Sequence, residues 1–232
     1  MGVAARIDWD GIDLVVFDVD GTLYDQTRLR RRMLLELGID CCRSRNLKTI
    51  RTLAAFRRCR EELSRARADE DFSLLQYRIT AERRQLHPAE VRAMVREWIE
   101  DRPVAFLASC RFEGVAELFA AIGRRGKGVA VWSDYPAVRK LKALGLSAGI
   151  VVASEEERRL KPDPAGLRRI LSESGIPATR TLLIGDRAEH DGEAGRRAGV
   201  RVLLKRRAPH PEFPTFSTYR DPVFRPLLEA TG

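Results

Sequence analysis

The chain has 232 residues, of which 44% are hydrophobic and 32% charged, and this suits a globular protein with a full-sized core. No stretch reaches the ~18–20 apolar residues that a membrane span needs, and acids occupy the N-terminal positions where an export signal would have its apolar core. The formal net charge is +9, but 36 of the 42 basic residues are dispersed arginines without an aromatic stacking pattern, which favours a small anionic ligand over a nucleic acid.

The first predicted element is a buried strand over residues 12–18, which contains the apolar run LVVF. Asp18 ends this strand, and Asp20 stands two residues later, just before Gly21, which permits a sharp turn. Because side chains alternate along an extended chain, the two carboxylates can point to the same side. Burying an unpaired carboxylate is costly, so the pattern indicates a functional role for both acids.

Residues 24–108 show no strand pattern and are rich in Arg, Leu, Ala and Glu, which predicts a helical segment inserted after the first strand. One of its predicted helices gathers apolar residues on one face, as expected for packing against other helices. These residues are Val91, Met94, Val95 and Trp98. The segment carries 19 basic and 13 acidic residues, which hints at an acidic substrate. Its basic run Arg28–Arg32 suits a solvated helix face, with contact to a second anion of the substrate as the alternative.

After the helical segment, short Val/Ile/Leu runs alternate with helical stretches of about ten residues. This alternation predicts a doubly wound α/β fold, a parallel sheet that includes the first strand and is covered by helices on both faces. We expect the sheet domain to comprise residues 1–23 and 109–232. Its Pro-rich tail, 206–232, is expected to run extended over the core, with a short helix near 223–230. The remaining predicted strands are 127–134, 149–154, 181–186 and 199–204, and the predicted helices are 136–144, 164–174 and 190–198.

Polar residues follow the carboxyl ends of the later strands as they follow the first one. Ligands of an open parallel sheet bind beyond these strand ends, so we expect the polar groups to converge at one rim. Clustered carboxylates repel one another unless a cation joins them, and oxygen ligands suit Mg²⁺. A lysine, a hydroxyl and strand-end amides can hold a phosphate, so the rim predicts phosphoryl chemistry. The residues are Asp18, Asp20, Ser133, Asp134, Lys161, Asp186 and Asp191.

The segments DVDGT, SD, KP and GDRAEHD span residues 18 to 191 in this order, and they resemble the four motifs of the haloacid dehalogenase superfamily. Any one segment is a weak signal, whereas four in order after predicted strands are a strong one. The resemblance implies a Rossmann-like core of residues 1–23 and 109–232. It further implies that 24–108 is the helical cap that one subfamily carries between motifs one and two, and that the protein is a Mg²⁺-dependent phosphatase.

The resemblance implies a role for each motif residue. Asp18 is expected to be the nucleophile that forms an aspartyl-phosphate. Asp20 is expected to protonate the leaving oxygen and then to activate water. The second and third motifs supply the phosphate-binding residues, which are Ser133, Asp134 and Lys161.

Metal ligands follow from the resemblance as well. Asp18, Asp186 and the backbone carbonyl of Asp20 would bind Mg²⁺. Asp191 would bind the metal through water or orient Lys161, and the alternative for Asp191 is a cap of the next helix.

Members of the superfamily catalyse different reactions, and residues of this chain separate some of them. The dehalogenases lack the second aspartate, so Asp20 argues against that reaction. Phosphonate hydrolysis needs a cap lysine, and Lys48 is the only lysine between residues 24 and 108. A phosphomutase would share all four motifs and remains an alternative, as does a catalytically silent binding protein.

The expected partner is a small, anionic, phosphorylated metabolite, such as phosphoglycolate, a nucleotide or a sugar phosphate. The four cysteines form no CxxC pair and stand at no zinc-like spacing from a histidine, which indicates reduced thiols in a cytoplasmic protein. Nothing in the sequence indicates an oligomeric state.

Overall fold

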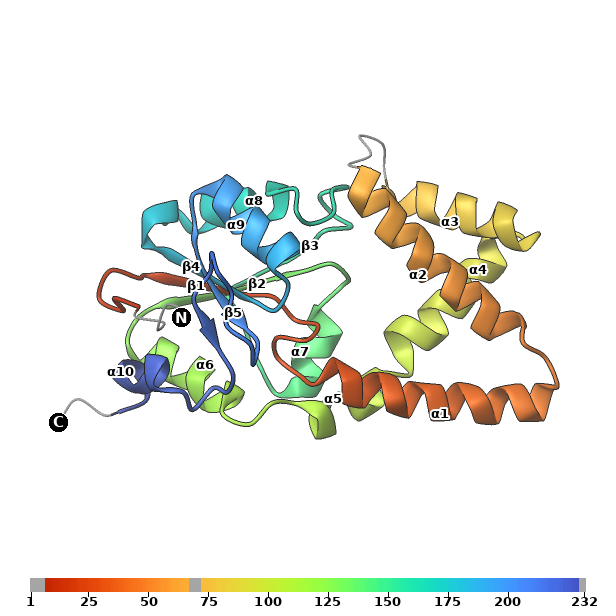
Figure 1. The fold of residues 1–232 in the computed structure, drawn as a ribbon, viewed down its shortest axis with the longest axis horizontal. Coiled ribbons are helices and arrows are strands. Elements are labelled where there is room, and N and C mark those ends of the chain that lie inside the picture. Colours follow the sequence, from red (N-terminus) through yellow and green to blue (C-terminus); the bar gives the residue numbers. More distant parts are fainter. Residues whose placement is uncertain (1–6, 67–71, 230–232) are drawn as a thin grey trace.

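The structure, a computed structural model, describes residues 7–66 and 72–229, and its centre is a six-stranded parallel sheet (Figure 1). The strand order is β3-β2-β1-β4-β5-β6, so the chain moves outward from β1 in one direction and then returns to build the other side. This reversal is that of a doubly wound sheet, and it confirms the predicted fold class. The strands are β1 Leu14–Phe17, β2 Gly128–Ser133, β3 Ile150–Ala153, β4 Thr181–Gly185, β5 Arg201–Lys205 and β6 Thr215–Phe216.

Helices cover both faces of the sheet because its central strand is apolar on both sides. Val15 and Phe17 of β1 pack into one core, with α6 and α7. Leu14 and Val16, which point the opposite way, pack into a second core with α8 and α9. Both faces are therefore buried, as a parallel sheet requires. These helices are α6 Val115–Arg124, α7 Val138–Leu144, α8 Ala165–Ser174 and α9 Glu193–Ala198.

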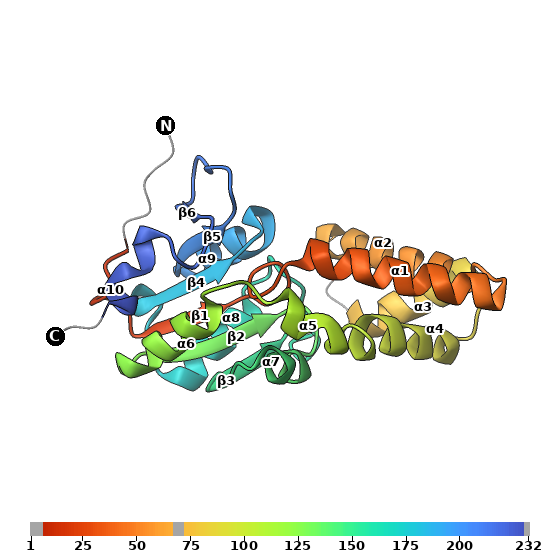
Figure 2. The ribbon, with the colours of Figure 1, turned by 90° about the horizontal axis from the view of Figure 1, so that it is seen from below.

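Between β1 and α6 the chain forms a separate group of helices beyond the carboxyl ends of the strands (Figures 1 and 2). Asp25 caps the first of them by accepting a hydrogen bond of 3.0 Å from the backbone N of Arg28. We propose that this group of helices is the inserted segment predicted from the sequence, with bounds at residues 24 and 108. None of the described helices combines the length and apolarity needed to cross a membrane. The group comprises α1 Gln26–Ser44, α2 Lys48–Ala66, α3 Phe72–Arg84, α4 Pro88–Val95, the π-helical segment Arg96–Asp101 and α5 Val104–Cys110.

The C-terminal tail adds a strand that the sequence does not predict. β6 pairs with β5 at the sheet edge, whereas we expected only extended chain over the core. A two-residue strand leaves no apolar run to recognise. The predicted short helix is present as the 3₁₀ turn Pro222–Phe224 followed by α10, Arg225–Leu228. Phe216, Tyr219 and Phe224 pack against one another, which fixes the tail on the core.

Candidate active site

Asp18 directly follows β1, and its backbone continues the pairing with β4 through a hydrogen bond to the carbonyl of Ile184 at 2.9 Å. The chain then turns at Gly21, whose φ of 95° favours glycine. A Cβ atom at Gly21 would collide with the carboxylate of Asp186, so the close approach of the two loops also requires glycine. Thr22, just after the turn, donates its hydroxyl to Asp18 Oδ2 at 2.9 Å. The glycine thus permits the two acidic loops to meet.

Lys161 lies at the centre of the site and is almost completely buried, at 1% exposure. Its Nζ donates to Asp18 Oδ1 at 2.7 Å, to Asp191 Oδ1 at 2.8 Å and to the carbonyl of Trp132 at 3.0 Å. Burial alone would lower the pKa of Lys161, but the two carboxylates outweigh it and raise the pKa. Lys161 is therefore a fixed positive charge between two acids.

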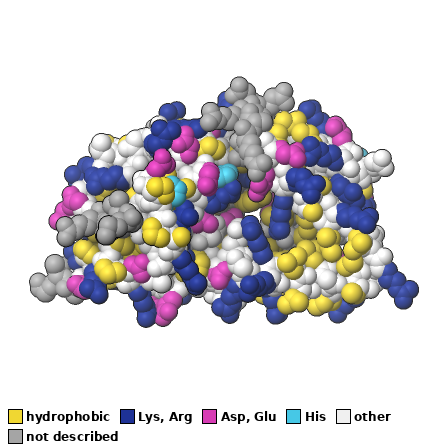
Figure 3. Space-filling model, in the orientation of Figure 1, with side chains coloured by type: hydrophobic (Ala, Val, Ile, Leu, Met, Phe, Trp, Pro, Cys, Tyr) yellow, Lys and Arg dark blue, Asp and Glu magenta, His cyan; other side chains and the backbone are white. Residues whose placement is uncertain are grey.

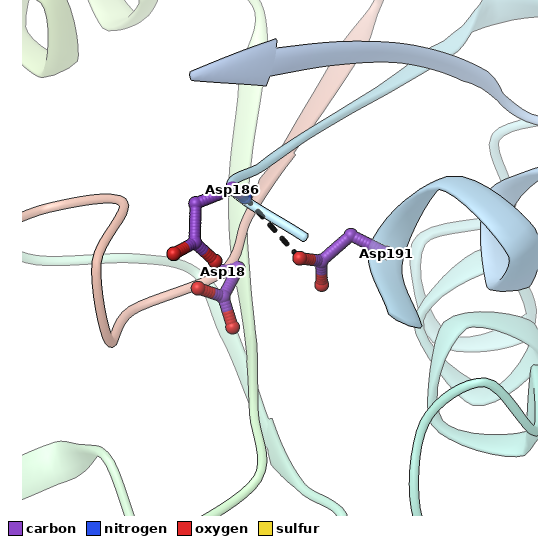
Figure 4. Close-up of side chains that lie close together, drawn as sticks. All are labelled: Asp18, Asp186 and Asp191. Carbon is purple, nitrogen blue, oxygen red and sulfur yellow. Dashed lines mark hydrogen bonds between the residues drawn. The ribbon is translucent and has the colours of Figure 1, made fainter. Parts of the chain in front are cut away.

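Three carboxylates meet in the site (Figure 4), and two of them bind Lys161. Oxygen atoms of Asp18, Asp186 and Asp191 all lie within 4.8 Å of one another. Asp191 Oδ2 accepts hydrogen bonds from the backbone N atoms of Asp186 at 3.2 Å and Arg187 at 3.1 Å, which holds the loop after β4. Asp186 Oδ1, in contrast, is buried without a hydrogen-bond partner among the described residues. Three acids beside one lysine leave an excess of negative charge.

The pKa shifts reflect this excess. Burial, with the charges of Asp191 and Asp186, raises the pKa of Asp18 well above its ordinary value, against the opposing effect of Lys161. Burial and the charge of Asp191 likewise raise the pKa of Asp186 to about 7. A cation among these oxygens would remove the repulsion, so the three acids could bind a divalent metal ion.

Asp20 has a different environment from Asp18. Both of its oxygens accept hydrogen bonds from Lys140 Nζ, at 2.6 and 2.8 Å, and Oδ1 also accepts one from the hydroxyl of Tyr24. Burial alone would raise the pKa of Asp20, but Lys140 and Tyr24 outweigh it and lower the pKa. Sequence reasoning missed Lys140. It stands within the predicted helix 136–144, and its rarity among so many arginines is the only signal that could have singled it out.

The second-motif residues lie beside the site, and only one of them faces the cavity. Ser133 is buried at 1% exposure, and its Oγ accepts a hydrogen bond of 3.3 Å from the backbone N of Tyr135. Ser133 is not among the cavity-lining residues, whereas Asp134 is. The carboxylate of Asp134 accepts a hydrogen bond from Ser154, and its carbonyl accepts one from Arg60 of α2.

A cavity of about 580 Å³ joins these residues to the helical segment. On one side it is lined by the aspartates and lysines of the strand ends, and on the other by α1, α2 and the chain around α5. Figure 3 shows the hollow between the two halves of the molecule. Such a volume is typical of small-molecule binding sites. The lining includes Asp18, Asp20, Asp134, Lys140, Lys161, Asp186, Asp191, Arg30, Arg57, Arg60 and Trp98.

Known proteins resemble the chain in overall fold and, over shorter stretches, in sequence. The 2-haloacid dehalogenase of Pseudomonas syringae is 21% identical and superposes with a TM-score of 0.63 over 90% of this chain and 95% of that one, which shows a common fold. The phosphoglycolate phosphatase of Rhodospirillum rubrum is 34% identical over 98 residues, which are 40% of each chain. The N-acetylmuramic acid 6-phosphate phosphatase of Pseudomonas aeruginosa is 34% identical over 100 residues, 41% of this chain and 44% of that protein.

These alignments span less than half the length of the curated relatives. The family assignment rests on a longer match. The model of the haloacid dehalogenase-like hydrolases matches residues 12–199, which is most of the chain, so the chain belongs to this family.

Proposed function

For this haloacid dehalogenase-like hydrolase, we propose Mg²⁺-dependent hydrolysis of a small-molecule phosphomonoester through a phosphoryl group carried on Asp18. One observation carries the proposal. Asp18 and Asp20 stand two residues apart and line one cavity, yet Lys161 holds the first carboxylate and Lys140 the second. Two carboxylates in two environments can take two roles, a nucleophile and an acid–base.

The first step transfers the phosphoryl group to Asp18. A carboxylate oxygen of Asp18 forms a bond to phosphorus, the ester P–O bond breaks, and the leaving oxygen takes a proton from Asp20. Asp20 acquires that proton when the phosphate enters, because a nearby anion raises the proton affinity of a carboxylate. In the second step a water oxygen attacks phosphorus, its proton passes to Asp20, and inorganic phosphate leaves Asp18.

The other residues bind the phosphoryl group and order the site. Lys161 offers the positive charge nearest to Asp18, so it would hold a phosphoryl oxygen. The hydroxyl of Ser133 and the backbone N–H of Asp134 would complete the phosphate site. Asp191 uses one oxygen for Lys161 and the other for two backbone N–H groups. This supports Asp191 as the residue that orients the lysine.

The residues at the strand ends suit a magnesium ion. Asp18 and Asp186 would hold it together with the Asp20 carbonyl, and the buried, unpartnered Oδ1 of Asp186 is a ready ligand. When bound, Mg²⁺ would neutralise charge on the phosphate and on the carboxylates around it.

The test is hydrolysis of 4-nitrophenyl phosphate by the purified protein, with Mg²⁺ and with EDTA, followed by a panel of metabolite phosphates. We expect turnover with Mg²⁺ only. A 2-haloacid serves as the control substrate, and Asp20 predicts that no halide is released. If no phosphate ester is hydrolysed with Mg²⁺ present, the proposal is wrong and a binding role takes its place.

We further propose a cytoplasmic location and a small anionic metabolite as the partner. All four cysteines carry free thiols in the structure, which suits a reducing compartment. The volume of the cavity, about 580 Å³, suits a small molecule.

A further inference from the structure

The side of the cavity formed by the helical segment carries positive charge that the protein does not neutralise. Arg30 of α1 and Arg57 of α2 both line the cavity. Neither side chain makes a hydrogen bond or an ion pair with any residue that the structure describes, although Glu61 and Glu100 line the same cavity. Two cations that face a cavity without partners are a favourable site for an anion.

The other basic side chains of the cavity contrast with this pair. Lys161 and Lys140 each bind an aspartate of the site. Arg60, one turn after Arg57 on α2, donates to the carbonyl of Asp134 and lies over the ring of Tyr135. These charges are therefore already engaged. Arg187, on the side of the strand ends, contacts His190. On the helical side, Arg30 and Arg57 are the cavity-lining cations for which the described residues provide no partner.

The two arginines line the same cavity as Asp20 and Tyr24. Both side chains are solvent-exposed. Partial desolvation and the charge of Arg30 lower the pKa of Arg57, with Tyr135 acting in the opposite direction. The charge of Arg30 also acts on Tyr24, whose hydroxyl binds Asp20. Because the proposed phosphate site lies at the strand ends, the part of the substrate that departs with the leaving oxygen would extend toward the opposite, helical side of the cavity, which the two arginines line.

The same side of the cavity is also apolar. α1 and α2 contribute aliphatic side chains, and Figure 3 shows hydrophobic side chains gathered on the helical half beside the hollow. A cavity of about 580 Å³ is far larger than a two-carbon leaving group requires. These apolar residues include Leu29, Met33, Leu34, Leu37, Ile50, Leu53 and Ile99.

We infer that the substrate is a phosphomonoester whose alcohol combines an apolar body with a second anionic group, which Arg30 and Arg57 bind. This inference rests on the proposed function and adds the class of leaving group. A carboxylate or a second phosphate meets the guanidinium groups equally well, since both accept paired hydrogen bonds from arginine.

The test compares phenyl phosphate with 3- and 4-carboxyphenyl phosphate, and with phosphoglycolate, which has the carboxylate but no apolar body. The enzymes are the wild type, Arg57→Gln, Arg30→Gln and, as controls, Arg58→Gln and Arg31→Gln. Both control arginines are exposed neighbours outside the cavity lining. The readout is the ratio of kcat/KM for a carboxylated and an uncarboxylated aryl phosphate, so effects common to both substrates cancel.

We expect the wild type to prefer a carboxylated aryl phosphate by about tenfold or more, over both phenyl phosphate and phosphoglycolate. Arg57→Gln and Arg30→Gln should each reduce the preference over phenyl phosphate by about tenfold, and the controls should keep it. Hydrolysis of phenyl phosphate without this preference, or a preference that survives both cavity variants, would overturn the inference while the phosphatase proposal stands. If phosphoglycolate is hydrolysed as well as or better than the carboxylated aryl phosphates, the inference that the alcohol has an apolar body is wrong. Failure of every ester with Mg²⁺ present contradicts the proposed function itself.

Discussion

At the scale of single residues, the central contrast is between two aspartates that differ in what surrounds them. Asp18 is packed against Asp186 and Asp191 with only Lys161 to offset them, and its pKa is raised, so its charge does not stabilise the fold. We therefore expect Asp18→Asn to lower kcat by at least about 10³-fold, because the nucleophile is lost. The free energy of unfolding should change by no more than about 1 kcal/mol. Steady-state kinetics and urea unfolding measure the two effects, and substantial residual turnover would rule out Asp18 as the nucleophile.

For Asp20 we expect the opposite, namely that its charge stabilises the fold. Its pKa is lowered by Lys140 and Tyr24 in spite of burial. A carboxyl group with a lowered pKa in the fold stabilises it above the unfolded-state value of about 3.9, and this contribution is lost as the pH falls through the folded pKa. Lys140→Met should thus lower the free energy of unfolding by about 1–3 kcal/mol at neutral pH. The loss should shrink in acid, where Asp20 is protonated.

Urea unfolding of the Lys140→Met variant at several pH values tests this. Lys142→Met is the matched control, because Lys142 is exposed on the same helix and lines no part of the cavity. An equal loss of stability at neutral and acid pH would mean that Lys140 acts through packing and not through its charge.

At the scale of elements, the sequence predicts the sheet and its order of helices well, because each buried strand is a short aliphatic run between helical stretches. β1 to β5 each lie within or close to a predicted range. The pairing of β6 with β5 escapes prediction, since its two residues carry no pattern and the pairing depends on distant chain. The same limit applies to Lys140. Its helix is predicted, but only the packing of α7 against the core shows that the amine reaches Asp20.

The sequence motifs predict which residues gather at the site but not all of their contacts. The five predicted aspartates and Lys161 line one cavity, as expected from strand ends that share one rim. The oxygen of Ser133 accepts the backbone N–H of Tyr135, a local contact that leaves the hydroxyl proton for a phosphate oxygen. Its role in phosphate binding stays a prediction, because Ser133 does not line the cavity.

The C-terminal tail stabilises the loop after β1, which carries Asp18 and Asp20. Tyr219 is fully buried, and its hydroxyl donates to the carbonyl of Thr22 at 2.7 Å. Tyr219→Phe leaves this carbonyl without its donor, so we expect the free energy of unfolding to fall by about 1–3 kcal/mol. Tyr77→Phe is the control, since that hydroxyl makes no hydrogen bond among the described residues. Equal stability of the two variants would show that the contact does not hold the loop.

At the scale of the whole molecule, the two halves meet over a site whose negative charge is incompletely balanced. Asp186 has a raised pKa of about 7 and a buried oxygen that no described residue contacts through a hydrogen bond, so the fold bears an electrostatic cost that a bound cation would relieve. A ligand that binds only the folded chain stabilises it by RT ln(1 + [L]/Kd), about 1.4 kcal/mol at ten times Kd. Mg²⁺ should therefore raise the melting temperature of the protein by several degrees.

A control with NaCl distinguishes metal binding at the three aspartates from a general effect of ionic strength. NaCl at matched ionic strength should leave the melting temperature nearly unchanged, because screening acts weakly on buried groups. In Asp186→Asn the stabilisation by Mg²⁺ should be lost, while the metal-free variant should be at least as stable as the metal-free wild type, since one of three crowded charges is gone. Thermal unfolding followed by circular dichroism measures all five conditions: the wild type alone, with Mg²⁺ and with NaCl, and the variant with and without Mg²⁺. If Mg²⁺ stabilises Asp186→Asn as much as the wild type, the ion binds elsewhere, and the excess charge at the strand ends must be balanced by protons alone.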